Sequence, residues 1–231
     1  GGFRTEERRA ALAAATAEHF AGCTNVVFVP WALADHDGYV SAMNDSSLSG
    51  DVALAGLHEA ADPAAAIAEA DGIYVGGGNT FRLIRALHET GVMETIRNRV
   101  RNDGVPYMGV SAGSNAACPT LMTTNDMPIT APPSFEALGL VPFQINPHYF
   151  EGHVLVADGD GHAEHFGETR DERIAQFHEE NDLPVVGLWE AGFLHITDGA
   201  IGLTGAPARI FRAGQASLDI TPPASLTDLL G

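Results

Sequence analysis

The sequence predicts an α/β fold of three layers, in which a mostly parallel sheet has helices on both faces and an antiparallel hairpin region lies near the C-terminus. Over the first 190 residues, short apolar runs typical of buried strands alternate with helical patterns, which favours parallel strands joined by right-handed crossovers. Later apolar runs are short and are separated by Asp198-Gly199 and Gly205, as in antiparallel hairpins. The length of 231 residues favours one domain spanning 1–231.

The first half of the chain carries clear signals for the beginnings of its helices. Thr5 is placed to cap a helix that continues to Phe20, because two glutamates fill the first turn after it. Asp62-Pro63 combines an N-cap with a proline at the first helical position and opens a helix that reaches Ala70. Further helices are expected over Asn79–Glu89 and Val92–Arg101, and strands over Asn25–Trp31, Val52–Leu57, Ile73–Val75 and Pro106–Val110.

The second half changes character after one more helix and strand. Thr169–Glu180 has apolar residues on one helical face, and the strand Pro184–Leu188 follows it. The three short runs of the hairpin region are Phe193–Thr197, Ile201–Leu203 and Arg209–Phe211. Residues 151–168 form an acidic stretch with several histidines, which we interpret as a solvated loop, with a metal site or an altered lid as the alternative.

Composition excludes several classes of function. Thirty acidic residues face 12 basic residues, all of them arginine, and the formal charge of −18 repels nucleic acid and anionic membranes. Apolar residues make up 45% of the chain and no apolar run reaches about 18 residues, so neither disorder nor a transmembrane helix is expected. Cys23 and Cys118 lie far apart and suggest neither a disulfide framework nor a zinc site, which favours a reduced, cytoplasmic setting.

Residues 109–113 (GVSAG) follow an expected strand and precede residues that can form a helix. This is the G-x-S-x-G pattern in the strand-turn-helix setting of a nucleophile elbow, with Ser111 as the nucleophile. A glycine-rich turn that only packs tightly explains the same residues. Gly76-Gly77-Gly78-Asn79 also follows a strand, and its backbone N–H groups could supply half of an oxyanion hole, whereas a phosphate-binding P-loop is excluded because the chain has no lysine.

A serine nucleophile needs a base, and His148 is the best placed of the ten histidines because it follows a short apolar strand. A structural histidine that is merely hydrogen-bonded is the alternative. Asp126 and Glu190 could each orient the imidazole, and the pattern does not choose between them.

Five segments together resemble peptidase E, the α-aspartyl dipeptidase family of serine peptidases whose fold is similar to that of class I glutamine amidotransferases. The similarity covers roughly residues 26–211 in consistent order, and its segments are GGGNTF (76–81), GVSAGSN (109–115), ACPTLMTTNDMPI (117–129), QINPH (144–148) and GETR (167–170). The order serine, histidine, then Glu190 also differs from the order of true α/β-hydrolases.

The resemblance implies a function and a set of roles. It implies hydrolysis of dipeptides with an N-terminal aspartate, with Ser111 as nucleophile, His148 as base and either Asp126 or Glu190 as the acidic member. It also implies an oxyanion hole from the amides of Gly78 and Ala112, and substrate contacts from Asn79 and Arg170, the latter suited to a carboxylate. No metal or cofactor is expected, and a cytoplasmic homodimer acting on a small peptide is implied.

The sequence departs from the family pattern in three places. The usual first strand is not recognisable, so we expect either a truncated N-terminus or a sheet that lacks an edge strand. The stretch between His148 and Gly167 is longer than usual, and Trp189 and Ala191 flank Glu190 where smaller or different residues are common. The rival hypotheses are therefore a related exopeptidase, namely a general aminopeptidase or β-aspartyl peptidase, and a catalytically inactive ligand-binding protein.

Overall fold

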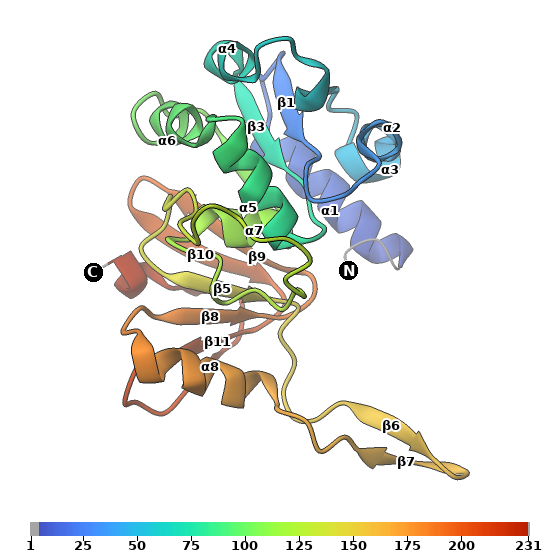
Figure 1. Cartoon of the computed structure of the whole chain (residues 1–231), viewed down its shortest axis with the longest axis vertical. Helices are drawn as coiled ribbons and strands as arrows, with labels where there is room; N and C mark the ends of the chain where they lie inside the picture. The colour runs from blue at the N-terminus through green and yellow to red at the C-terminus, as the bar shows by residue number, and fades with distance from the viewer. Residues whose placement is uncertain (1–4, 231) are drawn as a thin grey trace. The chain divides into compact units, whose positions relative to one another are not determined.

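The computed structural model describes residues 5–230 and divides into two compact units, Gly1–Pro147 and His148–Gly231. Figure 1 shows the elements of both units along the chain, and each unit is considered by itself below.

The first unit is built on a four-stranded parallel sheet. Its strands are β1 (Val26–Val29), β2 (Leu54–Gly56), β3 (Gly72–Val75) and β4 (Tyr107–Gly109), in the order β2-β1-β3-β4. All three pairings are parallel, and Val75 lies opposite Gly109 at the ends of β3 and β4. The prediction of a parallel sheet is confirmed. Strands β1, β2 and β4 lie within the ranges that the sequence indicated, and β3 begins one residue before its predicted range.

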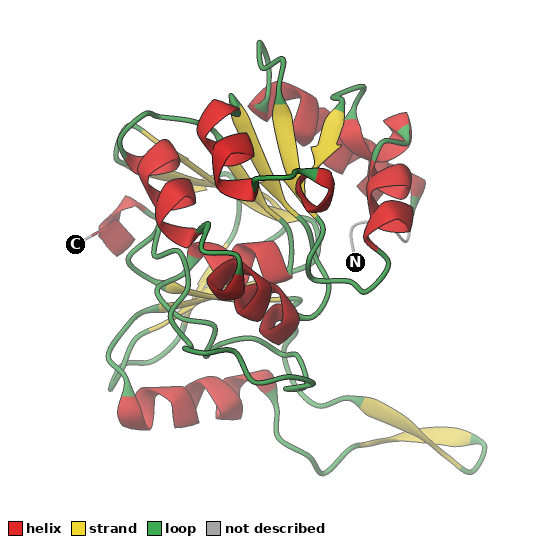
Figure 2. Ribbon diagram, turned by 45° about the horizontal axis from the view of Figure 1, so that its top comes forward, coloured by secondary structure: helices red, strands yellow, loops and turns green. Residues whose placement is uncertain are grey.

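Helices cover both faces of this sheet, because alternate strand residues point to opposite sides. Val27, Val29, Ile73 and Val75 pack in one buried cluster with residues of α4 (Pro63–Glu69), α5 (Thr80–Glu89), α6 (Met93–Arg101) and α7 (Ala112–Ala117). On the other face, Val26, Phe28 and Tyr74 pack with Phe20, which ends α1 (Glu6–His19), and with Met43 at the end of α2 (His36–Met43). Figure 2 shows the strands of this sheet between the two sets of helices.

The predicted helix caps at Thr5 and Asp62 are confirmed, because their side chains accept hydrogen bonds from backbone N–H groups in the first turns of α1 and α4. Asn79, which the sequence predicted as the first residue of a helix, is the N-cap of α5. Between β1 and β2, however, the chain forms α2, the single turn α3 (Ser46–Ser49) and, after β2, the 3₁₀ turn η1 (Leu57–Glu59), none of which was predicted. Gly38 inside α2 and the shortness of these segments leave no periodic apolar pattern to detect.

The second unit is antiparallel. Strands β8 (Val185–Leu188), β11 (Ala208–Phe211) and β12 (Leu218–Ile220) pair antiparallel, and α8 (Arg170–Glu180) supplies Ile174 to a core with Tyr149, Val185 and Phe211. A second sheet contains β9 (Gly192–Thr197), β10 (Ala200–Gly205) and β13 (Ala224–Ser225), and the 3₁₀ turn η2 (Thr227–Leu230) follows. Asp198 and Gly199 join β9 to β10 with positive φ of 51° and 74°, as a two-residue hairpin turn requires. The predicted C-terminal hairpin is confirmed.

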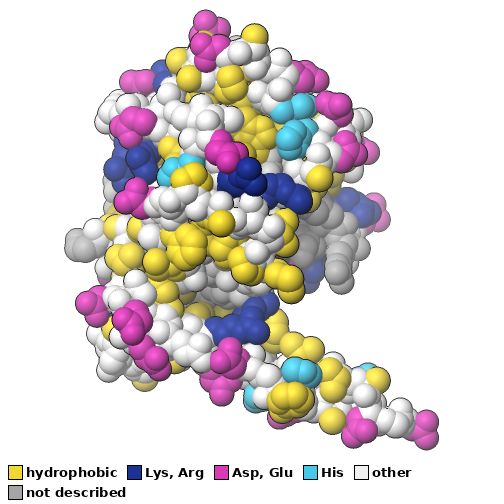
Figure 3. Space-filling model, in the orientation of Figure 1, with side chains coloured by type: hydrophobic (Ala, Val, Ile, Leu, Met, Phe, Trp, Pro, Cys, Tyr) yellow, Lys and Arg dark blue, Asp and Glu magenta, His cyan; other side chains and the backbone are white. Residues whose placement is uncertain are grey.

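The acidic stretch 151–168 contains a hairpin rather than an irregular loop. Strands β6 (Leu155–Asp158) and β7 (Gly161–Glu164) pair antiparallel, and nearly all of their residues are exposed. In Figure 3 this hairpin, at the lower right, shows acidic and histidine side chains beside apolar ones, and acidic side chains are scattered over the rest of the visible face. Within residues 5–230, no helix has the length and apolar character needed to cross a membrane.

Candidate functional site

The two glycine loops of the first unit lie side by side because β3 and β4 are adjacent parallel strands. Residues 76–79 follow β3, and residues 110–111 follow β4, at the same edge of the sheet. A Cβ atom added to Gly77 would lie 3.1 Å from the Cβ of Ser111 and 3.8 Å from its Oγ. The backbone of the glycine loop therefore lies so close to Ser111 that a side chain at residue 77 would crowd the serine.

Ser111 has the strained backbone of a nucleophile elbow. Its φ of 55° and ψ of −109° lie in a region that L residues rarely adopt, and it is the N-cap residue of α7. A Cβ atom on Gly113 would lie 2.2 Å from the carbonyl oxygen of Val75, so only glycine fits at that position. Glycine at the end of G-x-S-x-G thus allows the helix to start against β3 and the serine to stay at the edge of the sheet.

Several of the backbone amides around Ser111 donate to acceptors within the protein. The N–H groups of Gly76 and Asn79 donate to the carbonyl oxygens of Val29 and Ala32, and that of Gly77 donates to the Tyr39 hydroxyl at 2.8 Å. For the amides of Gly78 and Ala112, no acceptor is found in the described part of the chain. These are the two amides that the resemblance implies for the oxyanion hole. Ala112 is the first residue of α7, and Gly78 directly precedes Asn79, the N-cap of α5.

Two tyrosines that the sequence did not single out hold these loops. Tyr39 on α2 accepts from the Gly77 amide, and burial raises its pKa to about 12 although that hydrogen bond lowers it. Tyr107 on β4 donates to the carbonyl oxygen of Gly113 at 2.7 Å. No local sequence pattern marks either tyrosine, because Tyr39 contacts a residue 38 positions away and Tyr107 contacts one in the helix that follows its strand.

Asp126 binds the start of α5. Its Oδ2 accepts from the backbone N–H of Thr80 at 2.7 Å, from the Thr80 hydroxyl at 2.6 Å and from the Thr124 hydroxyl at 3.1 Å. A carboxylate at a helix N-terminus is stabilised by the free amides and the helix dipole. This arrangement ties residues 123–126 to the helix that begins directly after the glycine loop.

Polar residues of the recognised segments bind one another inside the first unit. The side-chain amide of Asn115 and the hydroxyl of Thr123 both donate to the Ile145 carbonyl oxygen at 2.8 Å. The side-chain amide of Asn146 donates to the Thr123 carbonyl oxygen and to Oδ1 of Asn125. Asn125 in turn donates to the carbonyl oxygen of Pro147, the last residue of β5 (Gln144–Pro147). The segments GVSAGSN, TTND and QINP therefore form one buried polar network, a role that their sequence patterns alone did not reveal.

His148 and Glu190 form a hydrogen-bonded pair in the second unit. Nδ1 of His148 lies 2.6 Å from Oε1 of Glu190, and the two side chains are 41% and 30% exposed. The pKa of the Glu190 carboxyl lies below its ordinary value: partial burial raises this pKa, but the hydrogen bond with His148 is among the interactions that lower it further. His148 has a positive φ of 56°, and Ala191, which follows Glu190, has a positive φ of 68°. The backbone is therefore strained at His148 itself and directly after Glu190.

The two predicted substrate-binding residues have different surroundings. Asn79 is the N-cap of α5, and its side chain both accepts from the Arg82 amide and donates to the Met127 carbonyl oxygen. Arg170 is half-buried at the first position of α8, over the ring of Phe150 at 5.2 Å, and its Nε is buried without a hydrogen-bond partner. Burial, and then the charge of Arg173, lower its pKa, and within residues 5–230 no carboxylate pairs with it. The helix N-terminus carries partial positive charge, which disfavours the guanidinium when it is unpaired. A bound anionic group would interact favourably with both the guanidinium and the helix N-terminus.

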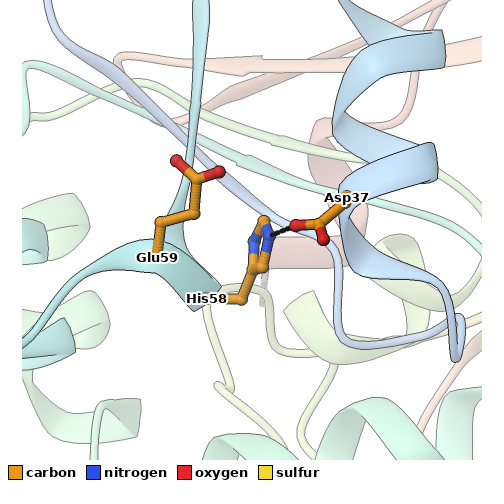
Figure 4. A group of neighbouring side chains, drawn as sticks. All are labelled: Asp37, His58 and Glu59. Carbon is orange, nitrogen blue, oxygen red and sulfur yellow. Dashed lines mark hydrogen bonds and ion pairs between the residues drawn. The ribbon is translucent and has the colours of Figure 1, made fainter.

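Among the described residues, one group has the types and spacing for a metal ion: Asp37, His58 and Glu59, whose ligand atoms lie within 4.8 Å of one another. Figure 4 shows the His58 imidazole directed at Asp37, to which Nε2 is bonded at 2.8 Å, while Asp37 is 87% exposed. This group lies on the surface between α2 and η1 and shares no residue with the predicted site. The acidic stretch 151–168 contains no such group in the part of the chain that the structure describes.

A strained serine at a strand-to-helix turn is a feature of serine hydrolases, and so is a histidine hydrogen-bonded to a carboxylate. The profile of peptidase family S51 matches residues 1–204 of the chain. The chain belongs to peptidase family S51, and the predicted resemblance to peptidase E serine peptidases is confirmed.

Individual relatives agree with this membership. Peptidase E of Streptomyces coelicolor is 49% identical over 206 residues, which cover 89% of this chain and 82% of the relative. A Drosophila melanogaster protein named "Probable alpha-aspartyl dipeptidase" is 44% identical over 91% of this chain and 85% of its own. The crystal structure of a peptidase from an acI-B1 Actinobacterium superposes with a TM-score of 0.59 over 96% of this chain and 90% of that one, at 16% identity. That likeness shows a shared fold.

Proposed function

We propose that this protein hydrolyses dipeptides with an N-terminal aspartate, the activity that the name of its Drosophila melanogaster relative describes. The observation that carries the proposal is the strained backbone of Ser111 at the start of α7. The amide of the next residue, Ala112, and the amide of Gly78 in the neighbouring glycine loop have no acceptor in the described chain. Strain of this kind persists only where the surrounding structure maintains it, and it is typical of active sites.

In the proposed mechanism, Oγ of Ser111 attacks the scissile carbonyl carbon while Nε2 of His148 takes the hydroxyl proton. The amides of Gly78 and Ala112 bind the negative oxygen of the tetrahedral intermediate. His148 then gives its proton to the leaving amine, the peptide bond breaks, and aspartate remains esterified to the serine. Water, deprotonated by the same histidine, hydrolyses the ester and releases aspartate.

Glu190 is the acidic residue that orients the base in this proposal. Its contact with Nδ1 of His148 fixes the tautomer in which Nε2 accepts the serine proton. Asp126 has a different task, because its carboxylate binds Thr80 and Thr124 and holds the start of α5. The sequence left both residues open, and their hydrogen bonds favour this division.

Arg170 is the proposed receptor for the aspartyl side chain. Its guanidinium is half-buried, stacks on Phe150 and pairs with no carboxylate in the described chain, so a substrate carboxylate can bind it bidentately. Phe150 is two residues from His148, in the same unit. Asn79 acts in this proposal as a helix cap whose contacts hold the glycine loop for substrate.

The architecture of the whole chain, its oligomeric state, its cofactor requirement and its cellular setting are also proposals. We propose the three-layer, class I glutamine amidotransferase-like architecture for the chain, supported by the parallel sheet with helices on both faces in the first unit. The length of the chain supports a single domain over 1–231. A homodimer and a mechanism without metal or cofactor are proposed from the family resemblance. A cytoplasmic setting is supported by the free thiols of Cys23 and Cys118.

The test is release of free aspartate from Asp-Leu, measured beside Ala-Leu, Glu-Leu, Asn-Leu and β-Asp-Leu. We expect turnover of Asp-Leu, its loss in Ser111→Ala, and wild-type turnover in the matched control Ser217→Ala, an exposed serine. Arg170→Gln should raise KM for Asp-Leu about tenfold or more and change any residual Ala-Leu turnover little.

Three outcomes would contradict the proposal in different ways. Full activity of Ser111→Ala would exclude the serine mechanism. Equal turnover of all five peptides, lost in Ser111→Ala, would keep the mechanism and replace the specificity with that of a general aminopeptidase. Binding of Asp-Leu without release of aspartate would identify a ligand-binding protein.

A further inference from the structure

Arg209 is a buried cation in the middle of β11, with 8% of its surface exposed, and it binds carboxylates from three separate segments. Nε and Nη2 donate to the two oxygens of Asp219 on β12 at 2.5 and 2.8 Å, a bidentate pair. Nη2 also donates to Glu151 at 2.9 Å, and Nη1 donates to Asp171 on α8 at 3.1 Å. The planar fork of an arginine bound in this way has one orientation, so the guanidinium is a rigid part of the unit.

The same guanidinium holds two aromatic side chains. Nη1 donates to the Tyr149 hydroxyl at 3.1 Å, and that hydroxyl donates to Asp171. The guanidinium carbon lies 5.8 Å from the ring centre of Tyr149 and 5.9 Å from that of Trp189, both within cation–π range. The two rings meet edge to face with their centres 4.3 Å apart.

These two aromatic residues are the sequence neighbours of the proposed base and its carboxylate. Tyr149 follows His148, and Trp189 precedes Glu190. The Tyr149 amide donates to the Leu188 carbonyl oxygen at 3.1 Å, and the Tyr149 ring occupies the space that a Cβ atom on Gly187 would need, 2.7 Å from Cδ2. His148 and Glu190 are therefore each one peptide bond from a residue whose side chain contacts Arg209.

The backbone needs such support, because His148 and Ala191 both have positive φ. Residues in this region of backbone space are held there by surrounding contacts, at a cost of roughly 1–3 kcal/mol each. Arg209 is outside the segment that matches the family profile, which ends at residue 204. Trp189 replaces the smaller or different residue expected beside Glu190, and its contact with Arg209 and Tyr149 gives this departure a structural role.

We infer that Arg209 is a positioning residue for the His148–Glu190 pair, which it holds in hydrogen-bond geometry by clamping Tyr149 and Trp189. The inference rests on the proposed function for the catalytic meaning of the pair, although the clamp itself can be measured without any substrate. A cation is required at this place because Glu151, Asp171 and Asp219 all face it, and a neutral side chain would leave their charges uncompensated.

The experiment compares Arg209→Lys and Tyr149→Phe with the wild type and with Arg212→Lys. Arg212 is a matched control because it lies one residue beyond β11 and donates only to the exposed Asp228 among the described residues. Two quantities are measured: kcat and KM for Asp-Leu, and the low-field NMR resonance of the His148 Nδ1 proton, identified by its disappearance in His148→Ala. Circular dichroism establishes that each variant is folded.

We expect Arg209→Lys to lower kcat about 10- to 100-fold with KM within threefold, since misplacement of a catalytic group by about 1 Å costs this much. The Nδ1 proton resonance should shift or vanish in Arg209→Lys and move in Tyr149→Phe, while Arg212→Lys leaves both quantities unchanged. A role in stability alone would lower the melting temperature and leave the resonance and kcat of the folded enzyme in place.

A folded Arg209→Lys variant with wild-type kcat and an unchanged resonance would overturn the inference. If the lysine variant does not fold, Tyr149→Phe decides on the same two readouts. Failure of the proposed function has a different signature: either the wild type does not cleave Asp-Leu, or His148→Ala retains activity, and the effect of Arg209 on the Nδ1 proton would stand in both cases.

Discussion

Ser111 and the residues that touch its neighbours show how single side chains build this site. The serine has its unusual backbone because Gly113 leaves no side chain between α7 and β3, and because Tyr107 holds the Gly113 carbonyl oxygen. The amide of Gly77 is bound by Tyr39, and the amides of Gly78 and Ala112 have no acceptor in the described chain. At the scale of residues, the proposed reactivity depends on which amides the protein itself leaves free.

Glu190 and Asp126 should therefore respond differently to loss of charge. We expect Glu190→Gln to lower kcat for Asp-Leu by roughly 10³–10⁴, because the amide no longer stabilises the imidazolium of His148. Asp126→Asn should mainly lower the melting temperature, because it weakens the bonds to the start of α5. Steady-state kinetics and thermal melts of the two variants separate the roles, and the reverse pattern would make Asp126 the third member of the triad.

Tyr39 allows a test of the glycine loop, residues 76–79, at a side chain that does not itself take part in the proposed reaction. Tyr39→Phe removes the acceptor of the Gly77 amide, and we expect kcat to fall about tenfold with KM unchanged, a fraction of the effect of losing an oxyanion donor outright. Tyr74→Phe is the matched control, since its ring packs on the same Phe28 and its hydroxyl does not bind the loop. Equal kcat values for the two variants would exclude this role of Tyr39.

Individual elements are joined by polar contacts that run between them. Asp71, between α4 and β3, accepts from the backbone amides of Thr24 and Asn25 at 2.8 Å each and from the Thr24 hydroxyl at 2.9 Å. These bonds connect the start of β1 to the start of β3, and the backbone bond from Thr24 is the main reason that the pKa of Asp71 is lowered.

The lowered pKa predicts a loss of stability in acid. A group whose pKa is lower in the folded than in the unfolded chain stabilises the fold above its unfolded value, and that stabilisation disappears as the pH falls through the folded value. For Asp71 the loss begins near its ordinary value of 3.8 and continues below it. Urea unfolding of Asp71→Asn should show lower stability at pH 7 and a smaller decline between pH 5 and 3, whereas Asp160→Asn, an exposed control, should follow the wild type.

The two compact units raise the question of how the whole molecule unfolds. The parallel unit ends at Pro147 and the antiparallel unit begins at His148, so the proposed nucleophile and its base come from different units. The proposed single domain over 1–231 predicts one cooperative unfolding transition for the whole chain.

Scanning calorimetry measures this directly. We expect a calorimetric enthalpy equal to the van't Hoff enthalpy for the full chain, and the same ratio in Ser217→Ala, which alters only an exposed serine. Two resolved transitions, or a calorimetric enthalpy well above the van't Hoff value, would indicate two independently folding domains.

Sequence patterns located most of the regular elements and the chemistry, because these depend on neighbours along the chain. The local signals include the caps at Thr5 and Asp62, the strands β1, β3 and β4, the turn at Asp198-Gly199 and the strand-serine-helix motif. The structure has each of them within a few residues of its predicted place. Among the elements that the sequence missed, α2 and the hairpin β6–β7 have no apolar periodicity, since a short or exposed segment buries too little to require one.

The sequence by itself determined the family and the candidate residues Ser111, His148, Asp126 and Glu190. Only the tertiary structure decided which carboxylate bonds to the imidazole, which amides lack acceptors, and that Tyr39 and Arg209 hold the loops and the aromatic neighbours of the pair. Hydrogen bonds such as these join residues that lie 38, 42 and 60 positions apart. A pattern read along one chain contains no information on such pairs, because their geometry exists only after the strands and helices have packed.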